Sequence, residues 1–197
     1  MSNAIKDGSS GELAEVYSDK KLATRSVTST EVQDAAQDGR AWNFNTGWIS
    51  SISADSALIY FKNEDSLRRD FFVDAIAVGF KDGSATDVQG VFFVSGPTGG
   101  TLVDATTDCD MIQNRRVGSS QELDATTLIY KPTASGQTLT GGSDSALFAQ
   151  NDQGRLFATV DFVVPKGQAC GVRMEVEGSF SGDVYCALVG HYRKDLG

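Results

Sequence analysis

The chain has 197 residues, 40% of them hydrophobic and 22% charged, which is enough for one folded core and a small appendage. Its 17 Lys and Arg against 26 Asp and Glu give a net charge of -9. This balance argues against a nucleic-acid partner, because binding to a phosphate backbone depends on clustered cations. No apolar run approaches the ~20 residues that span a bilayer, and the N-terminus lacks the apolar region of a signal peptide. We therefore expect no membrane partner.

The first 40 residues differ from the rest of the chain. They contain no Phe or Trp, and charges recur every few positions. A segment of this kind cannot bury enough apolar surface to fold alone, so residues 1–40 are expected to form an extended anchoring arm that a partner or a second copy holds. Within it, Thr28 and Glu31 have the spacing of a capping box and Gly39 is a helix stop signal, which predicts a short helix near residues 29–38.

From residue 41 onward the sequence changes to short runs of β-branched and aromatic residues separated by Gly, Asp, Asn, Ser or Pro. Such runs are typical of β-strands. The predicted strands are Ala41–Ile49, Ala57–Asn63, Phe71–Phe80, Val88–Ser95, Thr101–Asp104, Thr126–Lys131, Ala146–Gln150, Leu156–Val164, Gly171–Glu177 and Val184–Tyr192.

The pattern favours two packed antiparallel sheets in one domain over residues 41–197. No helix-length segment separates the strands, which disfavours a parallel sheet with crossover helices. The turn Val164-Pro165-Lys166-Gly167 suits a tight reversal, because Pro fixes φ and Gly accepts a positive φ. The runs Phe71–Val78 and Tyr185–Val189 are apolar on both faces, which predicts that these strands are central or covered by another subunit.

A long polar segment, Thr106–Asp124, is a candidate functional loop, since long loops often carry function. Asp104, Asp108 and Asp110 lie at or near its start and offer oxygen ligands for calcium. Their spacing matches no calcium-binding loop, because Gly is missing from the turn position and no Glu follows at the required offset. We expect neither a metal nor a cofactor, and interpret the acidic residues as solvated.

The residues that usually carry catalysis are sparse. His191 is the only histidine, and it is interpreted as a strand-end surface or interface residue. Cys109, Cys170 and Cys186 form no C-x-x-C pair, so they are expected to be buried or idle thiols, with a Cys170–Cys186 disulfide as the alternative. We expect a protein that is not an enzyme. A pair of carboxylates acting as in a glycosidase remains the one chemistry that the composition permits.

Two arginine clusters and two tryptophans are the other candidate binding residues. Asn114-Arg115-Arg116 is able to bind a phosphate or carboxylate, but in an acidic chain we favour a subunit interface. Arg68-Arg69-Asp70 is interpreted in the same way, as a turn with local pairing. Trp42 and Trp48 lie six residues apart, on one face if the strand is regular, where they are either core or interface residues or a platform for a sugar ring.

Several segments together resemble small structural proteins of tailed-bacteriophage virions. The segments that carry the resemblance are Gly11–Val16, Ala41–Gly47, Ala57–Asp65, Gly96–Leu102, Asn114-Arg115 and Phe162–Gly167. The resemblance extends from Gly11 to Gly190, and it implies a jelly-roll-like sandwich that is non-enzymatic, trimeric and located on the virion.

The fold class expected overall is all-β, an antiparallel jelly-roll-like β-sandwich after the N-terminal arm. The function expected is that of a capsid decoration, cement or head-fibre protein that binds the major capsid protein, or neck or tail proteins, through residues 1–40. The alternative function is recognition of a host glycan through Trp42, Trp48 or the loop Thr106–Asp124. The residues expected to contact a virion partner are Leu13, Val16, Tyr17, Leu22, Val32, Arg115 and Arg116.

Overall fold

The protein is described by a computed structural model over residues 4–6, 13–16, 22–23, 30–81, 88–104, 106–148, 155–176 and 180–193. The chain forms two compact units, Met1–Thr30 and Glu31–Gly197. The first contains three short strands that the sequence does not predict, β1 (Ala4–Lys6), β2 (Leu13–Val16) and β3 (Leu22–Ala23), paired antiparallel in that order.

The second unit contains two short helices and eleven strands among its described residues. The helices are α1 (Glu31–Gln37) and α2 (Thr101–Asp104). The strands are β4 (Ala41–Asn45), β5 (Ile49–Ile52), β6 (Ser56–Lys62), β7 (Phe71–Lys81), β8 (Val88–Ser95), β9 (Met111–Asn114), β10 (Leu128–Tyr130), β11 (Ser143–Phe148), β12 (Arg155–Val164), β13 (Ala169–Val176) and β14 (Gly182–Tyr192).

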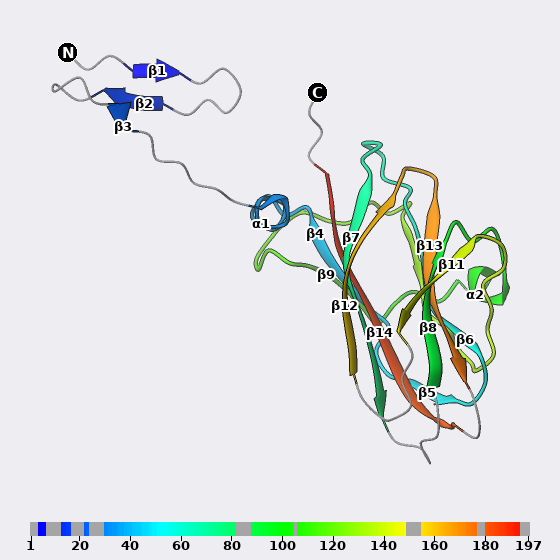
Figure 1. The fold of residues 1–197 in the computed structure, drawn as a ribbon. Helices are drawn as coiled ribbons and strands as arrows, with labels where there is room; N and C mark the ends of the chain where they lie inside the picture. Colours follow the sequence, from blue (N-terminus) through cyan, green and yellow to red (C-terminus); the bar gives the residue numbers. More distant parts are fainter. Residues whose placement is uncertain are drawn as a thin grey trace. The chain divides into compact units, whose positions relative to one another are not determined.

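The strands build two antiparallel sheets that face each other (Figure 1). One sheet has the order β10-β6-β13-β8-β11, and the other has the order β12-β7-β14-β4-β9 with β5 also paired to β14. Along the chain, β4 pairs with β14, β6 with β13, β7 with β12 and β8 with β11. This nesting is that of a long hairpin rolled into a sandwich, which is the jelly-roll topology. The expected fold class is confirmed.

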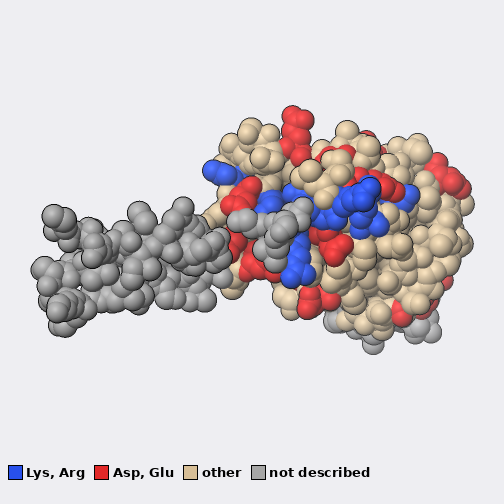
Figure 2. All heavy atoms as spheres, turned by 90° about the horizontal axis from the view of Figure 1, so that it is seen from above, with Lys and Arg blue, Asp and Glu red and all other residues tan. Residues whose placement is uncertain are grey.

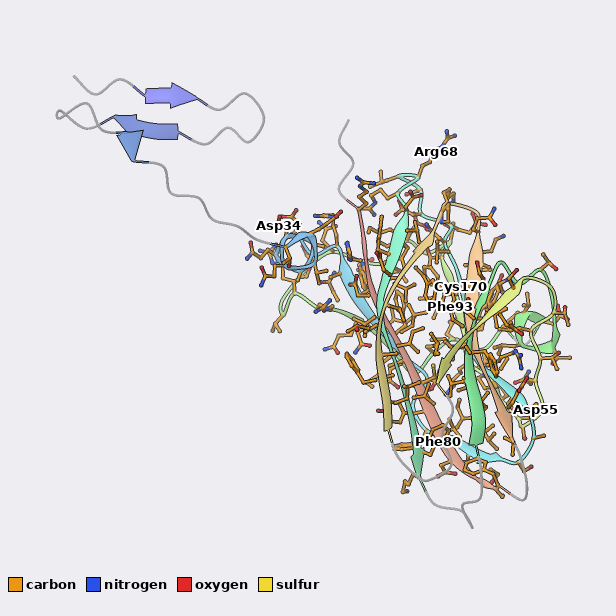
Figure 3. The ribbon with its side chains drawn as sticks, in the orientation of Figure 1. Asp34, Asp55, Arg68, Phe80, Phe93 and Cys170 are labelled. Atoms are coloured by element: carbon orange, nitrogen blue, oxygen red, sulfur yellow. The ribbon has the colours of Figure 1, made fainter. Side chains whose placement is uncertain are left out.

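The core lies between the sheets, where large aromatic side chains join them. Phe61 of β6 stacks on Phe44 of β4, with ring centroids 5.5 Å apart, and packs against Phe71 of β7 at 4.7 Å. Further along, Phe93 of β8 stacks on Phe162 of β12 at 4.0 Å, and Figure 3 shows Phe93 pointing between the sheets. Burial of these rings provides the main force that holds the sheets together.

The two strands with apolar residues on both faces, β7 and β14, lie side by side inside the six-stranded sheet, as predicted. The predicted turn before β13 is also present, with Gly167 at φ 80° and a hydrogen bond from the Gln168 N–H to the Pro165 carbonyl.

Three predictions along the chain are wrong. Thr101–Asp104 is a helical turn rather than a strand, since it follows Gly100 at φ 116°, where a Cβ would lie 2.3 Å from the Thr138 carbonyl oxygen. The strand predicted over Ala41–Ile49 stops at Asn45, and the chain bends before β5 begins. The loop Thr106–Asp124 contains β9, which pairs with β4.

Candidate attachment surface

Helix α1 is the first element of the second unit, and it packs on one end of the sandwich. Ala35 of this helix is fully buried, and the helix contacts strands β4 and β14. Gly39 ends the helix at φ 73°, and the Arg40 N–H then bonds to the Ala35 carbonyl at 2.7 Å. Because of this packing, the boundary of the domain lies at residue 30, ten residues before the position expected from the sequence.

Arg40 fixes the chain where it enters the sheet. Its guanidinium donates to the Tyr192 carbonyl and to a carboxylate oxygen of Asp38, the latter at 3.2 Å. In return, the Tyr192 N–H donates to the Arg40 carbonyl at 3.0 Å. The last residue of β14 is therefore tied to the residue that precedes β4.

His191 lies at the centre of the contact between the helix and the sheet. Its Nδ1 is 3.0 Å from Asp74 of β7, its Nε2 is 4.0 Å from Glu31 of α1, and its ring stacks on Phe72. The side chain is buried, so the prediction of a surface position is wrong. Arg115 approaches the same Asp74 carboxylate at 3.8 Å. Four residues far apart in the sequence thus form one charged cluster beside α1.

The neighbouring loops also pair their charges. Arg69 forms a bidentate pair with buried Asp65, at 2.7 and 3.0 Å, and its guanidinium lies 4.7 Å from the centre of the Tyr192 ring. Burial acts to raise the pKa of Asp65, but the hydrogen bonds from Arg69 outweigh it and the pKa is lowered. The partner of Arg69 is thus Asp65 rather than the adjacent Asp70.

Glu64 is held between two lysines of the same end. Lys166 donates to one of its oxygens at 2.8 Å, and Lys62 lies 2.7 Å from the other. These hydrogen bonds, the one from Lys166 first, lower the pKa of Glu64 to about 2. Figure 2, which looks onto this end from above, shows Lys and Arg side chains side by side with Asp and Glu. The surface is therefore a mosaic of ion pairs rather than a basic stripe, and a mosaic suits a protein surface better than a phosphate backbone.

An open cleft of about 440 Å³ adjoins the end of α1. It is lined by residues of β4, β9 and the segment after β9, among them Trp42, Ile112 and Arg116. Asn114 donates to the Gly39 carbonyl at 2.6 Å and so joins this segment to the helix. At the rim, Val117 is 98% exposed and Ile112 is partly exposed. Exposed apolar side chains bordered by charged groups are typical of a surface that binds protein.

The structure brings some of the predicted partner residues together at this end. Val32 lies half-buried on α1, Arg115 pairs with Asp74 beside the helix, and Arg116 lines the cleft. Leu13, Val16 and Leu22 fall in β2 and β3 of the first unit, where only the backbone is described, and Tyr17 lies outside the described residues. Sequence reasoning missed Glu31 and Asp74 as members, because only tertiary folding brings them near Arg115.

The candidate glycan residues are separated rather than paired. Trp42 is buried in the core, whereas Trp48 is 44% exposed and its ring meets Tyr185 edge-on at 5.0 Å. The expectation of one shared face is wrong, since the chain bends between β4 and β5. A second open cleft, of about 350 Å³, lies over the five-stranded sheet and is lined by Asp55, Asp144 and Arg173 among others.

The candidate metal ligands are dispersed and the thiols are unpaired in the described part of the chain. Among the residues there, no three His, Cys, Asp or Glu side chains are grouped closely enough to hold a metal ion, and Asp110 instead bonds to Lys131. The three thiols are buried and unpaired, as expected, so the alternative disulfide is not formed. Burial raises the pKa of Cys109 to about 12 and that of Cys170 further still, which leaves these thiols poor nucleophiles.

Comparison of the chain with protein-family models, curated proteins and solved structures finds no match. None of the helices in the described part of the chain is long and apolar enough to cross a membrane.

Proposed function

We propose that this chain is a non-enzymatic structural protein of a bacteriophage virion, attached to the capsid, neck or tail through its N-terminal unit. The observation that carries the proposal is the division at residue 30, because the chain on the C-terminal side is a complete jelly roll and Met1–Thr30 forms a unit of its own. A jelly roll is a common architecture of virion and lectin domains, and this part of the argument is an analogy of fold.

The charged end of the sandwich supports the same proposal. Residues 1–30 lead directly into α1, and Glu31 of that helix lies beside the cluster of Asp74, Arg115 and His191. Residues 1–30 contain no Phe or Trp and few apolar residues to form a core of their own, so a partner surface would supply the burial that they lack. A virion provides such a surface in many copies.

A binding assay tests the proposal. Virions of the phage that encodes the chain, grown without it, are mixed with either the full chain or residues 31–197, and the pelleted particles are assayed for bound protein. We expect the full chain to pellet with the particles and residues 31–197 to stay in the supernatant. Circular dichroism of residues 31–197 is the control that checks whether the shorter chain is folded. Equal binding of the two chains, or binding of neither, contradicts the proposal.

Recognition of a host glycan is a second candidate function, and the exposure of Trp48 favours it. The Trp48 ring is held edge-on by Tyr185, and Lys81 approaches its face at 6.0 Å. An exposed, fixed indole is the kind of surface on which a sugar ring stacks. On a glycan array we expect any signal of the full chain to be lost in Trp48→Ala. A chain that binds no glycan, or that binds as well without Trp48, excludes this site.

A further inference from the structure

Strand β12 is an unusually long free edge. It is the outermost strand of the six-stranded sheet and pairs with β7 along one side, while no other described strand pairs with its second side. It has ten residues, against four in β9, three in β10 and six in β11, the other three terminal strands. An edge strand presents unpaired N–H and C=O groups that can bind another strand, and proteins commonly keep such edges short.

The side chains of β12 do little to protect that edge. Exposure alternates strictly along it: Phe157 is 67% exposed and Val163 48% exposed, with Thr159 and Asp161 exposed between them. The intervening residues pack toward the core. This alternation continues through the irregularity in pairing with β7 between Thr159 and Phe162. From residue 156 to 164 there is no Pro and no Lys, and Asp161 is the only charged residue.

We infer that β12 pairs antiparallel with β12 of a second copy, about a twofold axis at Val160. In this register Phe157 lies opposite Val163 of the second copy, and Thr159 lies opposite Asp161. Each exposed apolar side chain is then covered by the other, and the hydroxyl of Thr159 faces a carboxylate. The six-stranded sheets of the two sandwiches then join into one continuous antiparallel sheet. Both copies contribute the same strand, as a twofold interface requires.

Other registers are less favourable. An axis at Thr159 pairs neither exposed apolar residue with the other, because Phe157 lies opposite Asp161 and Val163 opposite Arg155. An axis at Asp161 places two like charges directly opposite each other, which is destabilising. A shift by a single residue turns the exposed side chains of one copy to the wrong face. The strands of the N-terminal unit are unsuitable occupants, since β1, β2 and β3 have only three, four and two residues.

Sedimentation velocity of the full chain over a concentration series tests the association. We expect the parent chain to form a dimer, a species of twice the 21.0 kDa chain mass. Phe157→Lys is expected to weaken this dimer at least tenfold in its dissociation constant, so that the variant sediments as a monomer. Leu67→Lys is the matched control, because Leu67 is 62% exposed but lies in the loop before β7. A monomer at all concentrations, a trimer, or a dimer that Phe157→Lys leaves intact overturns the inference.

Engineered cysteines test the register. Thr159→Cys and Asp161→Cys are oxidised separately and as a mixture, and the native thiols do not interfere because they are buried. The proposed axis places residue 159 opposite residue 161, within reach of a disulfide. We expect the mixture to give much more covalent dimer than either variant alone. If the Thr159→Cys variant alone gives the most covalent dimer, the twofold axis lies at Thr159 and the proposed register is wrong. No cross-link in any combination overturns the pairing itself.

Discussion

His191 illustrates what individual residues contribute at the charged end of the sandwich. Its sequence position suggests only a polar strand end, whereas its neighbours Asp74 and Glu31 come from β7 and α1 and enclose the ring. Arg115 was foreseeable as a binding residue, because a cation in an acidic chain is expected to find a carboxylate. The identity of that carboxylate was not, since Asp74 is far away in the sequence and its contact depends on the register between β7 and β14.

The ion pairs of Glu64 are expected to make the stability of the protein depend on pH. The pKa of Glu64 is lowered to about 2 from an ordinary value of 4.5, so the stabilisation from its two lysines is complete above about pH 4.5 and is lost as the pH falls toward 2. We expect Glu64→Gln to lower the urea midpoint at pH 7 and to make it less dependent on pH in this range. An unchanged slope between pH 5 and 3 contradicts this assignment.

The reactivity of the three cysteines tests whether their thiols are buried in the folded protein. Because burial raises the pKa of each thiol, none forms an accessible thiolate at mildly alkaline pH. We expect iodoacetamide to leave the folded protein unmodified at pH 8 and to alkylate three residues once urea is added, as measured by intact mass. Rapid modification of the folded protein indicates that the core opens or is packed differently.

At the scale of elements, the sequence predicted long strands well and short ones poorly. Strands β7, β8, β12 and β14 were predicted from runs of apolar and β-branched residues, and β8 was placed at its observed bounds, Val88–Ser95. Thr101–Asp104 was predicted as a strand for the same compositional reason, but the left-handed Gly100 before it starts a helical turn. Strand β9 is only four residues long and lies within a mostly polar segment, where it pairs with β4.

Phe61 allows the contribution of the packing between the two sheets to stability to be measured, because it packs against rings of β4 and β7 across the core. We expect Phe61→Ala to lower the free energy of unfolding by about 3 to 5 kcal/mol, from lost burial and the cavity left behind. Leu67→Ala, at an exposed loop position, is the control and is expected to stay within about 0.5 kcal/mol of the parent. Both values come from urea titration, and a cost for Phe61→Ala near that of the control contradicts this account of the core.

At the scale of the whole molecule, the chain divides into two units at residue 30, whereas its composition changes near residue 40. The scarcity of apolar residues before residue 40 indicated a separate N-terminal segment. The boundary lies at residue 30, because α1 packs on β4 and β14 with Ala35 fully buried. A short amphipathic helix is ambiguous in sequence, since its partner surface is formed by β4 and β14 from opposite ends of the domain.

The proposed attachment makes residues 1–30 the part of the chain that contacts the particle. Cross-linking of assembled virions with an amine-reactive reagent, followed by mass spectrometry, measures this directly, because Lys6, Lys20 and Lys21 all lie in that segment. We predict that these lysines link to capsid, neck or tail polypeptides. Links from all three only to the sandwich of the same chain, or absence of the chain from purified virions, would contradict the proposal.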